Sequence, residues 1–336
     1  MAGPKDWTHP TLSGMDFNLS DDQLTWQSKA HELGKSLTAD AAADEVIRAA
    51  VTAGLIDTRA DLLAAVVAVE ALAYESSSAG VSLALHTGVT AGLDGDKQFA
   101  GLSRGDVVGA IALSSDDVPV EQGGRLSGRA AWVTPLTPLG VAVLGMRSGD
   151  GLSAAAVMLN APGVVQEPVD TAALGGLVCG HMRLDGAPFT AVGATMPFMS
   201  RVRILLSAAG LGMGRRALQE SLVAAHGRTG HGAGGEQTVQ GLLADAATEL
   251  DAAMLLTWKA AAASMLSFAD ASMAKLAATE ATQRAVARAT QVVGADSFRR
   301  GHIIERLAQD VRTLELFAGR TEALREAVAL ETLPRV

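Results

Sequence analysis

The stretch QVVGADSFRRGHIIERLAQDVRTLELFAGRTEALR, residues 291–325, decides the fold of this chain. Within it, apolar residues recur at helical spacing at Ile303, Ile304, Leu307, Val311, Leu314 and Leu316. This spacing predicts that most of the stretch forms one amphipathic helix. We expect Gly294 to end the preceding helix and Gly319 to end this one, because glycine accepts the left-handed conformation found at helix C-termini.

The same stretch resembles the C-terminal run of the acyl-CoA dehydrogenase family, which reads Q-x-x-G-G-x-G, then E-R-x-x-R-D-x-R, then Y-E-G-T-x-E. The positions that agree are Gln291, Gly294, Glu305, Arg306, Asp310, Arg312, Phe317, Gly319 and Glu322. By this resemblance, the four charged residues from Glu305 to Arg312 are interpreted as a structural ion-pair network.

The resemblance also implies a catalytic acid, the base that removes the α-proton of the substrate, directly before the last glycine. That position is Ala318 here, and a methyl group cannot accept a proton. Some relatives take their base from another helix, and the matching position is Val202, which is not an acid either. The sequence therefore predicts that the ordinary dehydrogenation chemistry of the family is lost.

Composition excludes several classes of function. The 336 residues suffice for two or three domains, and the 49% hydrophobic fraction comes with only 4% aromatic residues, as in close-packed alanine-rich helices. The net charge of −9 and the lack of a Lys/Arg cluster argue against a nucleic-acid partner. No apolar run is long enough to cross a bilayer, so no membrane association is expected.

The N-terminus and the cysteine content point to the cytoplasm. Residues 1–14 lack the basic and then apolar order of a signal peptide and are predicted to be a disordered leader. Cys179 is the only cysteine, so it cannot form an intrachain disulfide, and its apolar neighbours predict a buried thiol.

Hydrophobic periodicity divides the rest of the chain into three domains. Residues 15–105 are predicted to be helical, with Ser20 as the first N-cap and helices over 40–53, 60–75 and 81–93. His86 lies in the third of these helices and is interpreted as a hydrogen-bonded core residue.

Residues 106–196 read as short strands between polar turns, which predicts an antiparallel barrel or sandwich. The expected strands cover 107–113, 124–134, 139–147, 153–159, 164–167, 178–184 and 189–192. Residues 197–336 are predicted to form a four-helix bundle with helices over 201–225, 242–271 and 273–293. This α+β order of a helical domain, a small β domain and a helical bundle is the architecture that the resemblance implies.

The resemblance implies FAD at a subunit interface, and several residues would contact it if it is retained. The family strand G-x-K-x-W-I-T appears as GRAAWVT at 128–134, which keeps Trp132 and Thr134. Arg228 remains from R-x-Q-F-G, and Gln291 and Gly294 remain from the C-terminal glycine motif.

Other cofactor positions are changed. The family loop L-T-E-P-x-A-G-S-D begins here at Leu113 but then carries Asp116 and Asp117, whose charges would repel a pyrophosphate. The second glycine of the C-terminal motif is Ala295, and Arg320 replaces the threonine after the catalytic acid. These changes predict that the protein works without a cofactor, with bound FAD as the alternative.

The loss of redox residues on a preserved scaffold favours a repurposed, redox-neutral enzyme. A cyclisation, including one of the [4+2] type, on a long acyl or polyketide-like substrate of natural-product biosynthesis would need mainly shape and orientation. By position in the family, Trp132, Thr134, Phe317 and Arg320 would line its cavity. A homodimer or homotetramer is expected.

Two alternatives remain open. The chain could be the degenerate, non-catalytic subunit of a heteromeric FAD-dependent acyl-CoA dehydrogenase, because Arg228 and Gln291 serve a neighbour's cofactor in the family. It could also be an FAD-dependent oxidoreductase with a base elsewhere.

Overall fold

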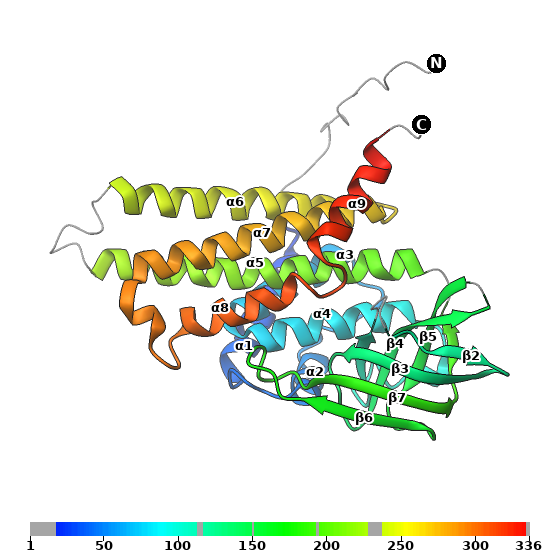
Figure 1. Ribbon diagram of the computed structural model, residues 1–336. Helices are drawn as coiled ribbons and strands as arrows, with labels where there is room; N and C mark the ends of the chain where they lie inside the picture. Colours follow the sequence, from blue (N-terminus) through cyan, green and yellow to red (C-terminus); the bar gives the residue numbers. More distant parts are fainter. Residues whose placement is uncertain (1–17, 113–116, 150, 193–194, 228–236, 334–336) are drawn as a thin grey trace, which may run out of the picture.

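The computed structural model describes residues 18–112, 117–149, 151–192, 195–227 and 237–333 (Figure 1). Four helices come first, followed by a short 3-10 helix: α1 (Asp21–Ser36), α2 (Ala43–Thr52), α3 (Leu62–Glu75), α4 (Ser77–Gly92) and η1 (Lys97–Phe99). Strands follow, and then a second group of helices, so the α+β architecture is confirmed. The predicted leader 1–14 lies outside the described residues, and the predicted domain boundaries stay predictions.

Helix α1 begins where the sequence predicts it. The backbone N–H of Gln23 donates to Ser20 Oγ over 3.2 Å, and the backbone N–H of Ser20 donates to Gln23 Oε1 over 2.9 Å. This reciprocal capping box satisfies two of the amide groups that a helix N-terminus leaves without intrahelical partners.

Helices α3 and α4 are buried along almost their whole length. They approach closely at Gly80 of α4, where an added Cβ would stand 2.5 Å from Ala73 Cα. The predicted helices over 60–75 and 81–93 are thus confirmed, and the second of them starts four residues earlier, at Ser77.

The strands form one eight-stranded sheet. They are β1 (Val108–Ala112), β2 (Val120–Gln122), β3 (Arg125–Val133), β4 (Gly140–Ser148), β5 (Gly151–Met158), β6 (Val164–Val169), β7 (Cys179–Ala187) and β8 (Thr190–Val192). The order is β6-β7-β3-β2-β4-β5-β8, with β1 paired to β4. The expectation of a wholly antiparallel sheet is wrong at two places, because β1 and β2 both pair with β4 in parallel.

His86 joins the first helices to the sheet. Its side chain is fully buried, with Nε2 3.1 Å from the carbonyl oxygen of Leu102, and Nδ1 accepts the backbone N–H of Gly109 over 3.0 Å. Both ring nitrogens are therefore satisfied in a neutral imidazole that is protonated on Nε2. The interpretation of His86 as a core residue is confirmed.

The second group of helices consists of α5 (Thr195–Gly227), α6 (Gln237–Ala262), α7 (Phe268–Val293), η4 (Gly294–Phe298), α8 (Ile303–Leu314) and α9 (Thr321–Thr332). Helices α5, α6 and α7 lie alongside one another, and α4 lies between α5 and the sheet (Figure 1). Gly294, with φ of 75°, ends α7 as predicted. The predicted helix over 242–271 is wrong, because it is interrupted between Ala262 and Phe268.

The prediction of one helix through most of 291–325 is also wrong. Helix α8 starts only at Ile303, where His302 Nδ1 accepts the backbone N–H of Ile304, and it ends at Leu314. Gly319 lies in the turn before α9 and does not cap α8. Leu316, which the spacing placed on the apolar face, is 64% exposed because it follows the end of the helix.

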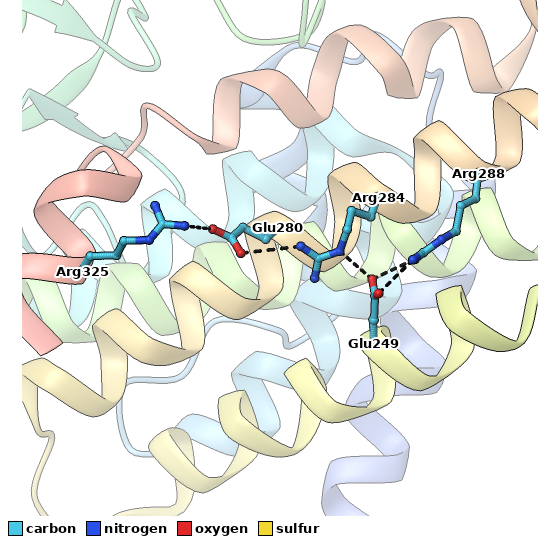
Figure 2. Close-up of polar contacts among 5 residues, drawn as sticks. All are labelled: Glu249, Glu280, Arg284, Arg288 and Arg325. Atoms are coloured by element: carbon cyan, nitrogen blue, oxygen red, sulfur yellow. Dashed lines mark hydrogen bonds and ion pairs between the residues drawn. The ribbon is translucent and has the colours of Figure 1, made fainter. Parts of the chain in front are cut away.

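A network of ion pairs joins α6, α7 and α9 (Figure 2). Glu249 of α6 accepts from Arg284 over 2.7 Å and from Arg288 over 2.8 Å, and the pKa of its carboxyl is lowered to about 2, mainly by its hydrogen bond with Arg288. Glu280 of α7 pairs with both Arg284 and Arg325, the latter on α9. This network holds the last helix against the bundle.

The predicted network among Glu305, Arg306, Asp310 and Arg312 is absent among the described ion pairs, because the four side chains point to different neighbours. Asp310 Oδ1 accepts the backbone N–H of Leu174, in the loop before β7, over 2.7 Å. Arg306 lies 3.7 Å from Asp40, which precedes α2. The residues of α8 therefore tie the bundle to the sheet and to the first helices.

Candidate functional site

The structure links the neighbour of Val202 to Ala318, and Val202 and Ala318 are the two positions at which the resemblance implies a base. Arg203 directly follows Val202 on α5, and its Nε donates to the carbonyl oxygen of Ala318 over 2.9 Å, across 115 residues of sequence. Neither position carries a carboxylate. An arginine, Arg203, thus connects the two positions that are predicted to lack a base.

The face of α7 that meets this place carries a stripe of residues spaced by three and four. The guanidinium of Arg203 lies 4.2 Å above the centre of the Phe268 ring, and its Nη1 donates to Ser272 Oγ over 2.7 Å. One turn further, Lys275 Nζ donates to Thr279 Oγ1 over 2.9 Å and to the carbonyl oxygen of Leu314. Lys275 therefore caps the C-terminus of α8 from a neighbouring helix.

Both cations are buried. Lys275 is 0% exposed and Arg203 is 5% exposed. Burial lowers the pKa of Lys275 to about 7, with the charge of Arg203 adding to the effect, and burial lowers the pKa of Arg203 to about 10. Neither side chain forms an ion pair with any acid in the described ranges.

The backbone around residue 318 is shaped for this contact. Ala318 has φ of 57° and is 8% exposed, so a non-glycine residue occupies the left-handed region in a buried turn. A Cβ on Gly319 would stand 3.0 Å from Arg203 Nη2. Glycine at 319, with φ of 116°, thus leaves room for the guanidinium.

Val202 is fully buried against α4. A Cβ placed on Gly88 would meet Val202 Cγ2 at 2.8 Å, so the two helices touch here. Position 202 therefore serves helix packing, and no proton acceptor lies at it.

Trp132 offers a flat aromatic surface at the end of β3. It is 53% exposed, its φ is 54°, and its ring lies edge-on to His181 of β7 with 5.2 Å between ring centres. Thr134 is only 2% exposed, and its hydroxyl lies 3.4 Å from the carbonyl oxygen of Trp132. An exposed indole of this kind fits stacking against a planar ring system, whereas the hydroxyl of Thr134 is directed inward.

The other predicted contact residues are spread around the C-terminal turns. Phe317 is half-buried against the core, and Arg320 is exposed at the N-cap of α9. Gln291 is exposed near the end of α7, and Gly294 is its C-cap. Arg228 and the loop residues 113–116 lie outside the described residues.

Two surface hollows lie elsewhere. A hollow of about 810 Å³ opens between α1, α3, α5 and α6, where His31 lies 3.1 Å from Glu75 and Arg215 lies 2.6 Å from Glu70. A smaller hollow of about 460 Å³ is lined by Arg201 and by the segment after α6. None of the predicted site residues lines either of them.

Sequence reasoning missed Arg203 and Lys275 as members of this site. Both residues adjoin or belong to segments that resemble the family. Arg203 follows Val202, and Lys275 lies in the MAKLAA segment at 273–278. Nothing in the linear sequence, however, signals that both side chains converge on residues 314–318.

Comparisons with known proteins agree with the fold. Residues 192–333 match the family model described as the C-terminal domain of acyl-CoA dehydrogenase. The short-chain specific acyl-CoA dehydrogenase of Bos taurus mitochondria is 28% identical over 314 residues, which cover 80% of this chain and 75% of the relative.

Two solved structures have the same fold. Butyryl-CoA dehydrogenase from Megasphaera elsdenii superposes with a TM-score of 0.84 at 19% identity, covering 95% of this chain and 100% of the other. PigA, solved with FAD and proline, superposes with a TM-score of 0.84 at 19% identity, covering 94% and 99% of the two chains.

The expectation that the protein works without a cofactor is wrong in the light of these structures. A protein of the same fold holds FAD at only 19% identity, so changed residues in the cofactor motifs do not argue against binding. Backbone N–H and carbonyl groups can make the hydrogen bonds of a cofactor site whatever side chains they carry, and a sequence motif does not record them.

Proposed function

The chain belongs to the acyl-CoA dehydrogenase family, and on this premise we propose that it is an FAD-binding enzyme that acts on an acyl thioester without a base at residue 318. The observation that carries the proposal is the contact between Arg203 and Ala318, because the resemblance implies a base at residue 318 and a buried cation holds this residue in place.

FAD binding is supported by the fold and by Trp132. The neighbouring structures include one solved with FAD, and the exposed indole beside His181 offers a surface for a planar ring. Bound FAD would supply a two-electron acceptor. Arg203 and Lys275 would keep residue 318 in position, because they hold the turn between α8 and α9 through the carbonyl oxygens of Ala318 and Leu314.

An acyl thioester as the substrate follows from the relatives, whose names specify acyl-CoA and butyryl-CoA. The predicted cyclisation of a long acyl or polyketide-like molecule has no counterpart among the names of these relatives. We therefore propose a reaction of an acyl thioester with bound FAD in place of a cyclisation. Trp132, Phe317 and Arg320 stay candidates for contact with the ligands by their position in the family.

The second candidate, favoured by the absence of a carboxylate at both 202 and 318, is a helper subunit that completes the site of a second, catalytic chain. This reading predicts that the isolated chain holds little FAD. A homodimer or homotetramer is what the first reading predicts.

The two readings are separated by the absorbance spectrum of the purified chain after addition of FAD and gel filtration, followed by denaturation to count the released flavin. We expect close to one FAD per chain. A Trp132→Ala variant is expected to hold FAD more weakly, since stacking is lost, and Leu152→Ala, which removes another exposed apolar side chain of the sheet, serves as its control. A colourless chain that gains flavin only with a partner chain would favour the helper subunit and contradict the proposed enzyme.

A further inference from the structure

Strand β3 departs from regular pairing near its end. Its register with β7 pairs Ala130 with Met182 and then Val133 with Gly180. Between these two pairs lie two residues of β3, one of which is Trp132, but a single residue of β7. An extra residue on one strand of an antiparallel pair is a β-bulge, so the exposed indole stands on a bulge.

The bulge turns the side chain of Trp132 out of the core. Side chains alternate between the two faces of a regular strand, so residue 132 would share the face of Ala130. Ala130 and Val133 are both buried in the core cluster of the sheet, although three residues separate them in sequence. The extra residue allows both of them to point inward and leaves Trp132 outside. Bulges that redirect a side chain in this way are common beside functional sites.

His181 is the single residue of β7 opposite the bulge, and its imidazole contacts Trp132 twice. Nδ1 accepts the backbone N–H of Trp132 over 3.4 Å, and the imidazole lies edge-on to the indole with 5.2 Å between ring centres. From the other side, the hydroxyl of Thr134 donates to the carbonyl oxygen of Trp132 over 3.4 Å. Two side chains therefore hold the backbone of the tryptophan.

Trp132 needs such support because of its backbone conformation. Its φ of 54° lies in the left-handed region, which is unfavourable for a bulky residue and persists only where surrounding contacts hold it. His181 is free to provide this contact. Glu167, its register partner on β6, instead lies 3.5 Å from Arg183, and the described ion pairs include none with His181.

We propose that His181 is a positioning residue for the cofactor, because it closes the bulge and holds the indole of Trp132 in the exposed orientation in which it stacks on FAD. This inference rests on the proposed function, since it concerns the indole to which FAD is proposed to bind. Without the imidazole, the bulge amide loses its acceptor and the indole loses a ring contact. Binding of FAD then has to order the indole, which lowers the affinity.

The test is a double-mutant cycle on FAD affinity, measured by titrating the full chain without cofactor against FAD and following flavin fluorescence. The four proteins are the wild-type chain, His181→Ala, Trp132→Ala and the double variant. We expect His181→Ala to raise the Kd of the wild-type chain about tenfold, as the loss of one hydrogen bond and one ring contact allows. In the Trp132→Ala background the same substitution should change the Kd less than about twofold, because His181 acts through the indole.

Two conservative variants divide the effect and replace His181→Ala in the cycle if circular dichroism shows that the alanine variant does not fold. His181→Asn keeps an acceptor close to the position of Nδ1, and His181→Phe keeps the ring without an acceptor. Each should bind FAD more tightly than His181→Ala and less tightly than the wild-type chain.

The outcomes are distinct. Wild-type affinity in His181→Ala, or in both conservative variants where they replace it, would overturn this inference and leave FAD binding standing. The same loss of affinity with and without Trp132 would also overturn it, because His181 would then act independently of the indole. A wild-type chain that binds no FAD would overturn the proposed function together with this inference.

Discussion

The guanidinium of Arg203 donates from Nε to the carbonyl oxygen of Ala318 over 2.9 Å and thereby fixes the turn between α8 and α9 to helix α5. The contact uses the backbone of residue 318, so it does not depend on which side chain stands there. The turn can therefore keep its position whichever side chain residue 318 carries, and the side chain here is that of alanine.

Gly212 of α5 allows a close approach between α5 and α3. A Cβ at this position would stand 2.2 Å from the carbonyl oxygen of Glu70 and 2.8 Å from the backbone nitrogen of Tyr74. We expect Gly212→Ala to lower the free energy of unfolding by about 1–3 kcal/mol or more, because backbone must move. Urea unfolding followed by circular dichroism measures this change.

Gly241 of α6 provides the matched control. A Cβ there meets nothing within 4 Å, so Gly241→Ala should raise the free energy of unfolding by up to about 1 kcal/mol through helix propensity alone. Equal effects of the two substitutions would contradict the close contact between α3 and α5.

Asp310 is the link between the bundle and the sheet. Its Oδ1 accepts the backbone N–H of Leu174, and burial raises the pKa of its carboxyl. Asp310→Ala leaves this buried N–H without a partner and should cost about 2–3 kcal/mol of unfolding free energy. Asp310→Asn keeps an acceptor oxygen and should cost clearly less. The unfolding free energies of both variants are measured by thermal unfolding. An alanine variant as stable as the asparagine variant would contradict the stabilising hydrogen bond between Asp310 and Leu174.

His86 makes stability depend on pH. Burial lowers the pKa of its imidazole to about 4, whereas in the unfolded chain it titrates near the ordinary value of 6.5. Between these values the unfolded state binds more protons, so the stabilisation is fully present above pH 6.5 and is lost as the pH falls towards 4. The loss is roughly 3 kcal/mol.

The measurement is the free energy of unfolding at pH 7 and at pH 4.5 for the wild-type chain and for His86→Gln. Glutamine does not titrate, so the variant should lose less stability on acidification. The same loss in both proteins would contradict this role of His86.

The sequence predicts most helices and strands because their signals are local. The Ser20 cap, the two buried helices before the sheet and the longer strands follow from capping residues and periodicity. Strand β2 has a single apolar residue, Val120, so its three residues carry no hydrophobic alternation from which it could be predicted.

Tertiary contacts decide what the sequence does not predict. The helical spacing of apolar residues continues past Leu314. Helix α8 nevertheless ends at Leu314, and Lys275 Nζ donates a hydrogen bond to the carbonyl oxygen of that residue. The role of Arg203 was equally hidden, because its partner lies 115 residues away. The sequence itself shows alanine at residue 318, where the resemblance implies a base, whereas the buried cations Arg203 and Lys275 near this residue required the structure.

We propose that the chain binds FAD and lacks a base at residue 318. Anaerobic titration of the FAD-loaded protein with butyryl-CoA tests this combination most directly. The visible flavin absorbance of the wild-type chain should decrease only slowly, because residue 318 offers no base, and in Ala318→Glu it should decrease at least about 100-fold faster, which is the range of a positioned general base. Ala318→Gln should behave like the wild type. Rapid bleaching of the wild-type flavin, not accelerated by Ala318→Glu, would place the base elsewhere and contradict the account.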